Sequence, residues 1–211
     1  MKIAVIDYEI GNVRSILEAF NNQGAKVILT NNREEILESD GLVLPGVGAF
    51  SQGMKNLRSY DLVSVIKEYV GLDKPMIGIC LGMQILFEES EEFGETQGLG
   101  LIPGRVVQLP TKDSQNGKLP HISWNEINTN ITPWKNTILE DIHDGSDMYF
   151  VHSFVAQPSD PCDVLSLTEY SNHNFCSSVK RGSIYGCQFH PEKSGSLGLK
   201  IIKNFTRICS L

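Results

Sequence analysis

Hydrophobic residues follow one spacing in the first half of this chain and another in the second half. Short apolar runs in the first half predict buried strands at residues 2–7, 27–29, 41–44 and 76–79. Between them, apolar residues recur every three or four positions, as on one face of a helix. Two such helices are predicted, one from Val13, Ile16, Leu17 and Phe20 with Gly24 after its end, and one from Leu62, Val63, Ile66, Tyr69 and Val70. Asn32 predicts the N-cap of a further helix, whose first turn carries Glu34 and Glu35. This alternation predicts a mostly parallel sheet with helices on both faces.

The second half contains strand-like runs that follow one another closely. They cover residues 106–109, 149–155, 164–168, 175–179 and 184–189. Polar turns separate the later runs, which predicts antiparallel hairpins, and residues 108–118 form the most loop-like stretch. A C-terminal helix that packs on the sheet is predicted from Ile201, Ile202, Phe205 and Ile208. The predicted fold class is therefore α/β. We expect a single domain over residues 1–211, with a mostly parallel central sheet covered by helices and a C-terminal antiparallel strand extension.

Composition excludes several classes of protein. The chain has 211 residues, a length that suits one domain with a sizeable core. A net charge of −7, without a cluster of Lys and Arg, argues against nucleic-acid binding. No apolar run approaches the ~20 residues of a membrane span, and a strand stands where a signal peptide would begin. Five cysteines without a Cys-x-x-Cys pair argue against a disulfide scaffold, so a reducing cytoplasm is the expected setting.

Residues 78–82, Gly-Ile-Cys-Leu-Gly, carry the clearest chemical signal. Cys80 stands between the strand at 76–79 and a helix predicted over residues 83–89, with a glycine two positions away on each side. This pattern is the cysteine form of a nucleophile elbow, in which glycines allow a sharp turn. The start of the helix offers free N–H groups to an oxyanion, and its dipole favours the thiolate. The alternative is a buried structural cysteine beside two packing glycines.

A second signal follows the strand at residues 184–189. A cysteine nucleophile needs a base and a group that orients the base, and His190-Pro191-Glu192 supplies an imidazole and a carboxylate across a stiff bend. The alternative is a structural histidine with an unrelated surface glutamate. His152, on an apolar strand, is the competing base, although no carboxylate follows it two residues later. Cys187-x-x-His190 could be half of a metal site, but no second half has matching spacing, so no metal is expected.

These motifs together resemble the class I, or triad, glutamine amidotransferases, and the resemblance covers essentially the whole chain. Residues 44–50, Leu-Pro-Gly-Val-Gly-Ala-Phe, resemble the oxyanion loop of the family. Residues 120–125, Pro-His-Ile-Ser-Trp-Asn, and 149–153, Tyr-Phe-Val-His-Ser, are similar to one subfamily. That subfamily is the glutaminase subunits of imidazole glycerol phosphate synthase, from histidine biosynthesis.

The resemblance implies hydrolysis of glutamine to glutamate and ammonia through a thioester on Cys80, with no cofactor. It implies that His190 and Glu192 complete a triad with Cys80. The implied oxyanion and substrate-binding residues are Gly46, Val47, Leu81, Gln84, Glu92, Ser153 and Phe154. In particular, the Leu81 N–H and an N–H from the Gly46–Val47 loop would hold the oxyanion.

The resemblance also implies a partner that receives the ammonia, a cyclase subunit with a (β/α)8-barrel fold that forms a heterodimer with this chain. Asn12, Trp124 and Lys193 are the expected interface residues. Residues 122–123 are Ile-Ser, where subunits of the histidine pathway usually carry Met-Gly. Because of this departure, the alternative function is that of a paralogous subunit that supplies ammonia for surface-sugar amidination. A more distant alternative is an elbow-cysteine protein of the chaperone or deglycase type, although such proteins lack a late His-Pro-Glu.

Overall fold

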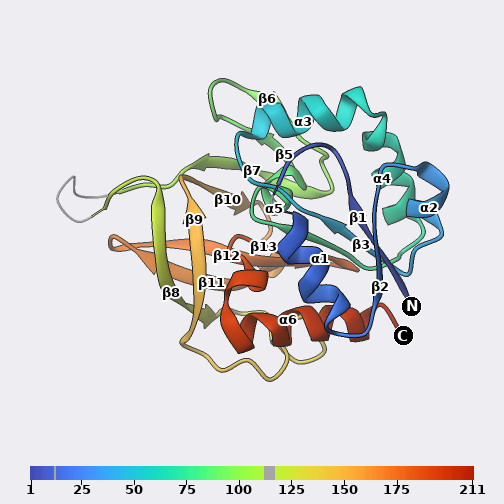
Figure 1. Cartoon of the computed structure of the whole chain (residues 1–211). Coiled ribbons are helices and arrows are strands. Elements are labelled where there is room, and N and C mark those ends of the chain that lie inside the picture. The colour runs from blue at the N-terminus through green and yellow to red at the C-terminus, as the bar shows by residue number, and fades with distance from the viewer. Residues whose placement is uncertain (12, 112–116) are drawn as a thin grey trace.

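A large mixed sheet forms the centre of the molecule (Figure 1). The computed structural model describes residues 1–11, 13–111 and 117–211. In spatial order, the large sheet consists of β2 (Lys26–Thr30), β1 (Lys2–Ile6), β3 (Gly41–Leu44), β4 (Met76–Ile79), β13 (Ile184–Cys187), β12 (His173–Arg181), β11 (Val164–Tyr170), β8 (His121–Thr129) and β9 (Ser146–His152). The strands from β2 to β13 are parallel. The strands from β13 to β9 are antiparallel. The predicted parallel half and antiparallel extension are therefore confirmed.

Helices cover both faces of the parallel half. They are α1 (Val13–Asn21), α2 (Arg33–Leu37), α3 (Phe50–Ser59), α4 (Leu62–Gly71), α5 (Leu81–Ile85) and α6 (Gly195–Ile208), and two short 3-10 turns are η1 (Pro161–Asp163) and η2 (Pro191–Lys193). Helices α1 and α6 share one face, where Phe20 and Phe205 meet edge to face with ring centroids 6.0 Å apart. Helices α3 and α4 cover the opposite face. The predicted cap of α2 is confirmed, because the Asn32 side chain accepts the Glu35 N–H at 3.0 Å.

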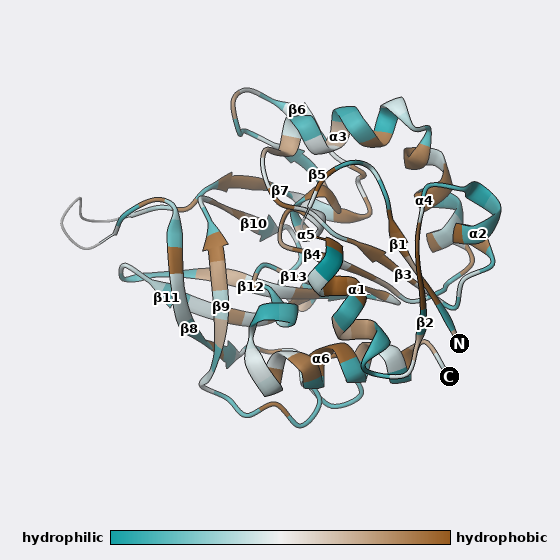
Figure 2. Ribbon diagram, viewed as in Figure 1, coloured by the Kyte–Doolittle hydropathy of each residue, from teal (hydrophilic) through white to brown (hydrophobic). Residues whose placement is uncertain are grey.

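The sequence of β1 shows why the sheet is covered on both sides. Ile3 and Val5 belong to the core under α1 and α6, whereas Ala4 and Ile6 belong to the core under α3 and α4. Since successive side chains of a strand point to opposite faces, a strand that is apolar throughout needs a cover on each face. Figure 2 shows these hydrophobic strands between helices that are hydrophilic on their outer sides.

A second, smaller sheet was not predicted, and it corrects two expectations. It consists of β10 (Phe154–Pro158), β7 (Ile102–Gln108), β5 (Phe87–Ser90) and β6 (Thr96–Gln97). The helix predicted over residues 83–89 is wrong in its second half, because α5 ends at Ile85 and Phe87 begins β5, which pairs with β7. The strand predicted at 149–155 divides at Ser153, where the chain leaves the large sheet for the small one.

Two further elements were missed. Helix α3 is rich in polar residues, and β8 has only two buried positions, so neither shows a clear apolar pattern in the sequence. The loop-like stretch at 108–118 is only partly covered, because residues 112–116 lie outside the described residues. No helix in the described part of the chain has the length and apolar composition that a bilayer crossing requires.

Candidate active site

Cys80 occupies a strained turn between β4 and α5. Its φ of 54° and ψ of −110° are unusual for a residue with a side chain, and such strain is typical of a nucleophile elbow. A Cβ atom on Gly82 would lie 1.9 Å from the Leu44 carbonyl oxygen, and one on Gly78 would lie 2.5 Å from the Gly82 oxygen. Only glycine fits at these two positions, so the elbow predicted from the sequence is present.

The parallel pairing of β4 and β13 brings His190 to the same edge of the sheet as Cys80. Cys187 at the end of β13 lies opposite Ile79 at the end of β4, so the residues that follow both strands are neighbours. His190 Nδ1 lies 2.8 Å from Glu192 Oε1, and the two side chains are 3% and 2% exposed. A histidine that donates from Nδ1 to a carboxylate keeps Nε2 free for proton transfer.

The surroundings of His190 favour its protonated form. Burial lowers the pKa of His190, but Cys80 and Glu192 together oppose burial and raise this pKa to about 10. His190 Nε2 is buried and makes no hydrogen bond to any described residue. The imidazole is therefore poised to hold a proton beside Cys80, with Nε2 as the atom available for transfer.

His152, the competing base, already uses both ring nitrogens. Nδ1 lies 3.0 Å from the Phe154 carbonyl oxygen, and Nε2 lies 3.0 Å from His121 Nδ1. Burial, with a contribution from His121, lowers the pKa of His152 to about 3, so the ring stays neutral. The geometry favours His190 as the base and gives His152 a structural position at the edge of the site.

The expected oxyanion hole is occupied by the protein's own backbone. The Leu81 N–H donates to the Gly46 carbonyl oxygen at 3.3 Å, so this carbonyl faces the place where an oxyanion would bind. The Cys80 thiol, in turn, faces the Val151 carbonyl oxygen at 3.7 Å. In this arrangement the Leu81 N–H is therefore not available to an oxyanion. The Cys80 thiol also makes no hydrogen bond to His190.

A cavity of about 330 Å³ opens beside Cys80. It is lined by the predicted residues Val47, Cys80, Leu81, Gln84, Glu92, Ser153 and Phe154, and also by Gly48, Pro120, Val151 and His152. The Gln84 side chain donates from Nε2 to the Phe154 carbonyl oxygen at 2.9 Å. Glu92 Oε2 accepts the Phe50 N–H at 2.7 Å, so one of its oxygens caps α3 and the other is left for a ligand. Small polar ligands bind in cavities of this size and lining.

The predicted interface residues, as far as they are described, both lie beside Tyr149. Trp124 is 51% exposed on β8, and its ring centroid lies 5.9 Å from that of Tyr149. Lys193 Nζ lies 6.0 Å from the Tyr149 centroid and makes no ion pair with the described residues. The Tyr149 and His190 ring centroids are 6.5 Å apart, so Tyr149 lies between exposed Trp124 and the buried His190. Asn12 lies outside the described residues.

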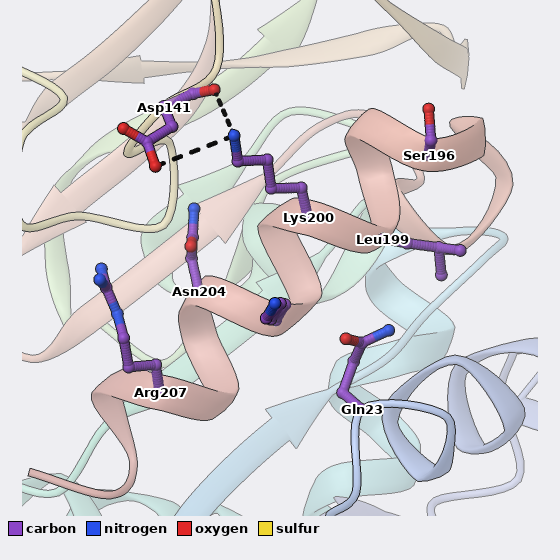
Figure 3. A pocket seen from close by; sticks show the side chains of 8 residues that line it. Gln23, Asp141, Ser196, Leu199, Lys200, Asn204 and Arg207 are labelled. Carbon is purple, nitrogen blue, oxygen red and sulfur yellow. Dashed lines mark hydrogen bonds and ion pairs between the residues drawn. The ribbon is translucent and has the colours of Figure 1, made fainter.

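A larger hollow, of about 610 Å³, lies along α6 and away from Cys80 (Figure 3). Lys200 Nζ contacts both the carbonyl oxygen of Asp141, at 2.8 Å, and its carboxylate, at 3.8 Å. Arg207, also in this hollow, pairs with Glu140. The residues that line it include no cysteine or histidine, so size alone does not make it the candidate site.

A buried Cys-His-Glu arrangement on an α/β sheet defines a class of amide-cleaving proteins, and sequence comparison agrees. The family model for class-I glutamine amidotransferases matches residues 4–209, and the chain belongs to this family. One relative is imidazole glycerol phosphate synthase subunit HisH 1 of Legionella pneumophila (strain Lens), 46% identical over 210 residues, which are 98% of this chain and 99% of the relative. The HisH subunit of Aquifex aeolicus (strain VF5) is 44% identical over 211 residues, with coverages of 98% and 97%.

Solved structures share the fold at lower identity. A glutamine amidotransferase superposes with a TM-score of 0.73 at 17% identity, and the match covers 99% of each chain. The glutaminase domain of Trypanosoma brucei CTPS superposes with a TM-score of 0.69 at 14% identity, with 100% of this chain and 94% of the other covered. Family membership decides against the chaperone or deglycase alternative.

Proposed function

We propose that this chain is the glutaminase subunit of an imidazole glycerol phosphate synthase and serves histidine biosynthesis. It hydrolyses glutamine to glutamate and ammonia. The observation that carries the proposal is the buried His190–Glu192 pair beside the elbow Cys80, in a chain that is 44–46% identical to named HisH subunits along nearly its whole length.

Each chemical step is assigned to one group of the candidate site. Cys80 gives its thiol proton to His190, and the thiolate attacks the side-chain amide carbon of glutamine. His190 then protonates the leaving nitrogen, which departs as ammonia and leaves a γ-glutamyl thioester on Cys80. Water attacks the thioester, with His190 as base, and releases glutamate. Glu192, bonded to Nδ1, orients the imidazole and stabilises its charged form throughout.

The oxyanion formed in both attacks needs two N–H donors. Leu81 N–H is one, once the Gly46 carbonyl has turned away from it. A rotation of the peptide between Gly46 and Val47 removes that carbonyl and presents the Val47 N–H in its place. Gln84, Glu92 and the backbone at Ser153–Phe154 line the remaining walls and hold the amide, the α-amino group and the carboxylate of glutamine.

The ammonia passes to a partner, because free ammonia is protonated and lost in bulk water. The proposed partner is a (β/α)8-barrel cyclase subunit that forms a heterodimer with this chain over the mouth of the cavity. Exposed Val47, Ile122 and Trp124 support this surface, at 40%, 58% and 51% exposure. Asn12 and Lys193 complete the proposed interface. The cytoplasmic setting, inferred from the cysteine content, stays a prediction.

Reconstitution tests the proposal. The chain is mixed with the cyclase subunit from the same source, its ribosyl-formimino substrate and glutamine, and imidazole glycerol phosphate is measured. We expect glutamine-dependent product with the wild-type chain and none with Cys80→Ser, whereas added ammonium salt should support both. Failure to bind this cyclase, together with ammonia supply to a sugar amidotransferase pathway, would make the paralogous function the correct one.

A further inference from the structure

A chain of side-chain amides runs behind Cys80, and the triad does not account for it. Gln188, fully buried just after β13, places Nε2 at 3.8 Å from Cys80 Sγ. Its Oε1 lies 3.0 Å from Gln84 Nε2, and the same Nε2 lies 2.9 Å from the Phe154 carbonyl oxygen. Four groups from three distant parts of the sequence are thus joined from the cavity wall to the nucleophile.

The direction of this chain follows from its fixed end. A carbonyl oxygen only accepts, so the Gln84 atom that faces Phe154 must be its NH₂ group. The same NH₂ group faces Gln188, so the Gln188 atom opposite it must be the acceptor Oε1. The other end of the Gln188 amide, its NH₂ group, must then face the sulfur. Turning either amide around would bring two donors or two acceptors together in a buried place.

The sulfur therefore lies between one donor and one acceptor. The thiol can give its proton to the Val151 carbonyl oxygen at 3.7 Å while it accepts from Gln188. The thiolate loses the first contact, because it has no proton to donate, and keeps the second. Hydrogen bonds to an ionised acceptor are stronger than those to a neutral one, so the Gln188 N–H favours the thiolate.

We propose that Gln188 is a further catalytic residue, whose amide N–H stabilises the Cys80 thiolate, and that Gln84 holds this amide in the required orientation. In the first step the thiol proton moves to His190 Nε2, and the electron pair left on sulfur is held by the Gln188 N–H. In deacylation the C–S bond breaks, and the same N–H receives the departing thiolate. The role rests on the proposed function, but the thiolate itself can be measured without glutamine.

The variants proposed below leave the other titratable side chains near the sulfur unchanged in the sequence. They are His190 and Glu192 after β13, His152 at the end of β9, Glu92 in the cavity wall and Tyr8 after β1. The pKa of His152 is lowered to about 3. Burial raises the pKa of Tyr8 above its usual range. Cys80 itself helps to raise the pKa of His190, so the thiol and the imidazole titrate as a pair, and a difference between variants in the alkylation profile reports on this pair.

The test is the pH dependence of Cys80 alkylation by iodoacetamide, followed by peptide mass mapping of the full chain. Gln188→Met removes the donor at similar volume and should move the midpoint to higher pH, so that the rate at neutral pH falls roughly three- to tenfold. Gln188→Glu, which turns an acceptor to the sulfur, should lower the rate further. Exposed Cys162 is an internal reference whose rate should not change. The matched control Gln157→Met, at an exposed glutamine of β10, should leave both rates unchanged.

A second variant separates orientation from packing. Gln84→Met leaves the Gln188 amide free to turn, so it should shift the midpoint in the same direction by less, and the double variant should shift it by less than the sum. A role in packing alone predicts a lower thermal midpoint with an unchanged alkylation profile. An unchanged profile in Gln188→Met or Gln84→Met, with the wild-type circular dichroism retained, would overturn the proposal, whatever the outcome of the reconstitution.

Discussion

The hydrogen bond between the Gly46 carbonyl and the Leu81 N–H predicts a low rate of glutamine hydrolysis by the chain without its partner. Opening the oxyanion hole breaks this bond, which is long at 3.3 Å and contributes about 0.5–1.5 kcal/mol. The peptide rotation also turns the φ of Val47, now negative, into the positive region. For a residue with a side chain this costs about 1–2 kcal/mol. The sum, about 1.5–3.5 kcal/mol, holds the open form roughly tenfold to a few hundredfold below the closed form.

Substitutions at Val47 separate the two costs. Val47→Gly removes the penalty of positive φ, so the basal kcat of the isolated chain should rise about five- to thirtyfold. Val47→Ala keeps a Cβ and should change kcat much less. Val47→Pro has no N–H and holds φ near −65°, so it should stay slow even with the partner bound. Val47 is 40% exposed, and its loss should hardly affect folding.

The assay is glutamate release at saturating glutamine by the purified chain, with the thermal midpoint of each variant measured in parallel. The reasoning fails if Val47→Gly, at a thermal midpoint close to that of the wild type, is no faster than Val47→Ala. It also fails if the isolated wild-type chain already reaches the rate of the complex, since the closed loop would then not limit hydrolysis.

Four further expectations concern the site and its surface. Cys80→Ser should abolish hydrolysis, and an electrophilic glutamine analogue should add mass to the Cys80 peptide alone; wild-type-like activity in the variant would remove the assignment. His190→Asn should be as damaging as loss of Cys80 and clearly worse than His152→Asn, and the reverse order in kcat would identify His152 as the base. His152 has a pKa near 3 when folded, against about 6.5 unfolded, so the unfolded chain binds more protons between these values. Stability is therefore lost as pH falls below 6.5, by at most about 1.4 kcal/mol per pH unit, and urea unfolding from pH 7 to 4 should show a shallower loss in His152→Phe. Trp124→Ala should weaken binding of the cyclase subunit in a titration, whereas Lys193→Ala should lower the partner-induced rise in kcat more than it lowers affinity.

Local chemistry made much of this site predictable from the sequence. The elbow motif lies within a few positions of Cys80, and Gly78 is required by a contact with nearby Gly82, whereas Gly82 is required by a contact with Leu44 on the neighbouring strand β3. The hydrogen bond between His190 and Glu192 is likewise local, because only Pro191 separates the two residues. The alternation of strands and helices placed the Gly46 loop and Cys80 at the same sheet edge, because parallel strands end together.

Other features depend on partners that are far away in the sequence. Residues 83–89 read as one helix in the sequence, yet Phe87 begins a strand because β7 offers a pairing edge. The break at Ser153 has the same cause, since two sheets compete for one continuous run of strand formers. Local propensity is weaker than such pairing, so no window of sequence could have revealed either feature.

The sequence by itself determined the family and the elbow and supplied the candidate triad residues, because the motifs that carry them are residue types at short, fixed spacings. Only the tertiary structure decided the state of the site. The closed Leu81 N–H, the neutral and fully bonded His152, and the direction of the Gln188 amide all depend on which atom of a distant residue faces which. Hydrogen bonds are made between atoms in space, and a buried polar atom takes its role from its partner, whatever the distance between them along the chain.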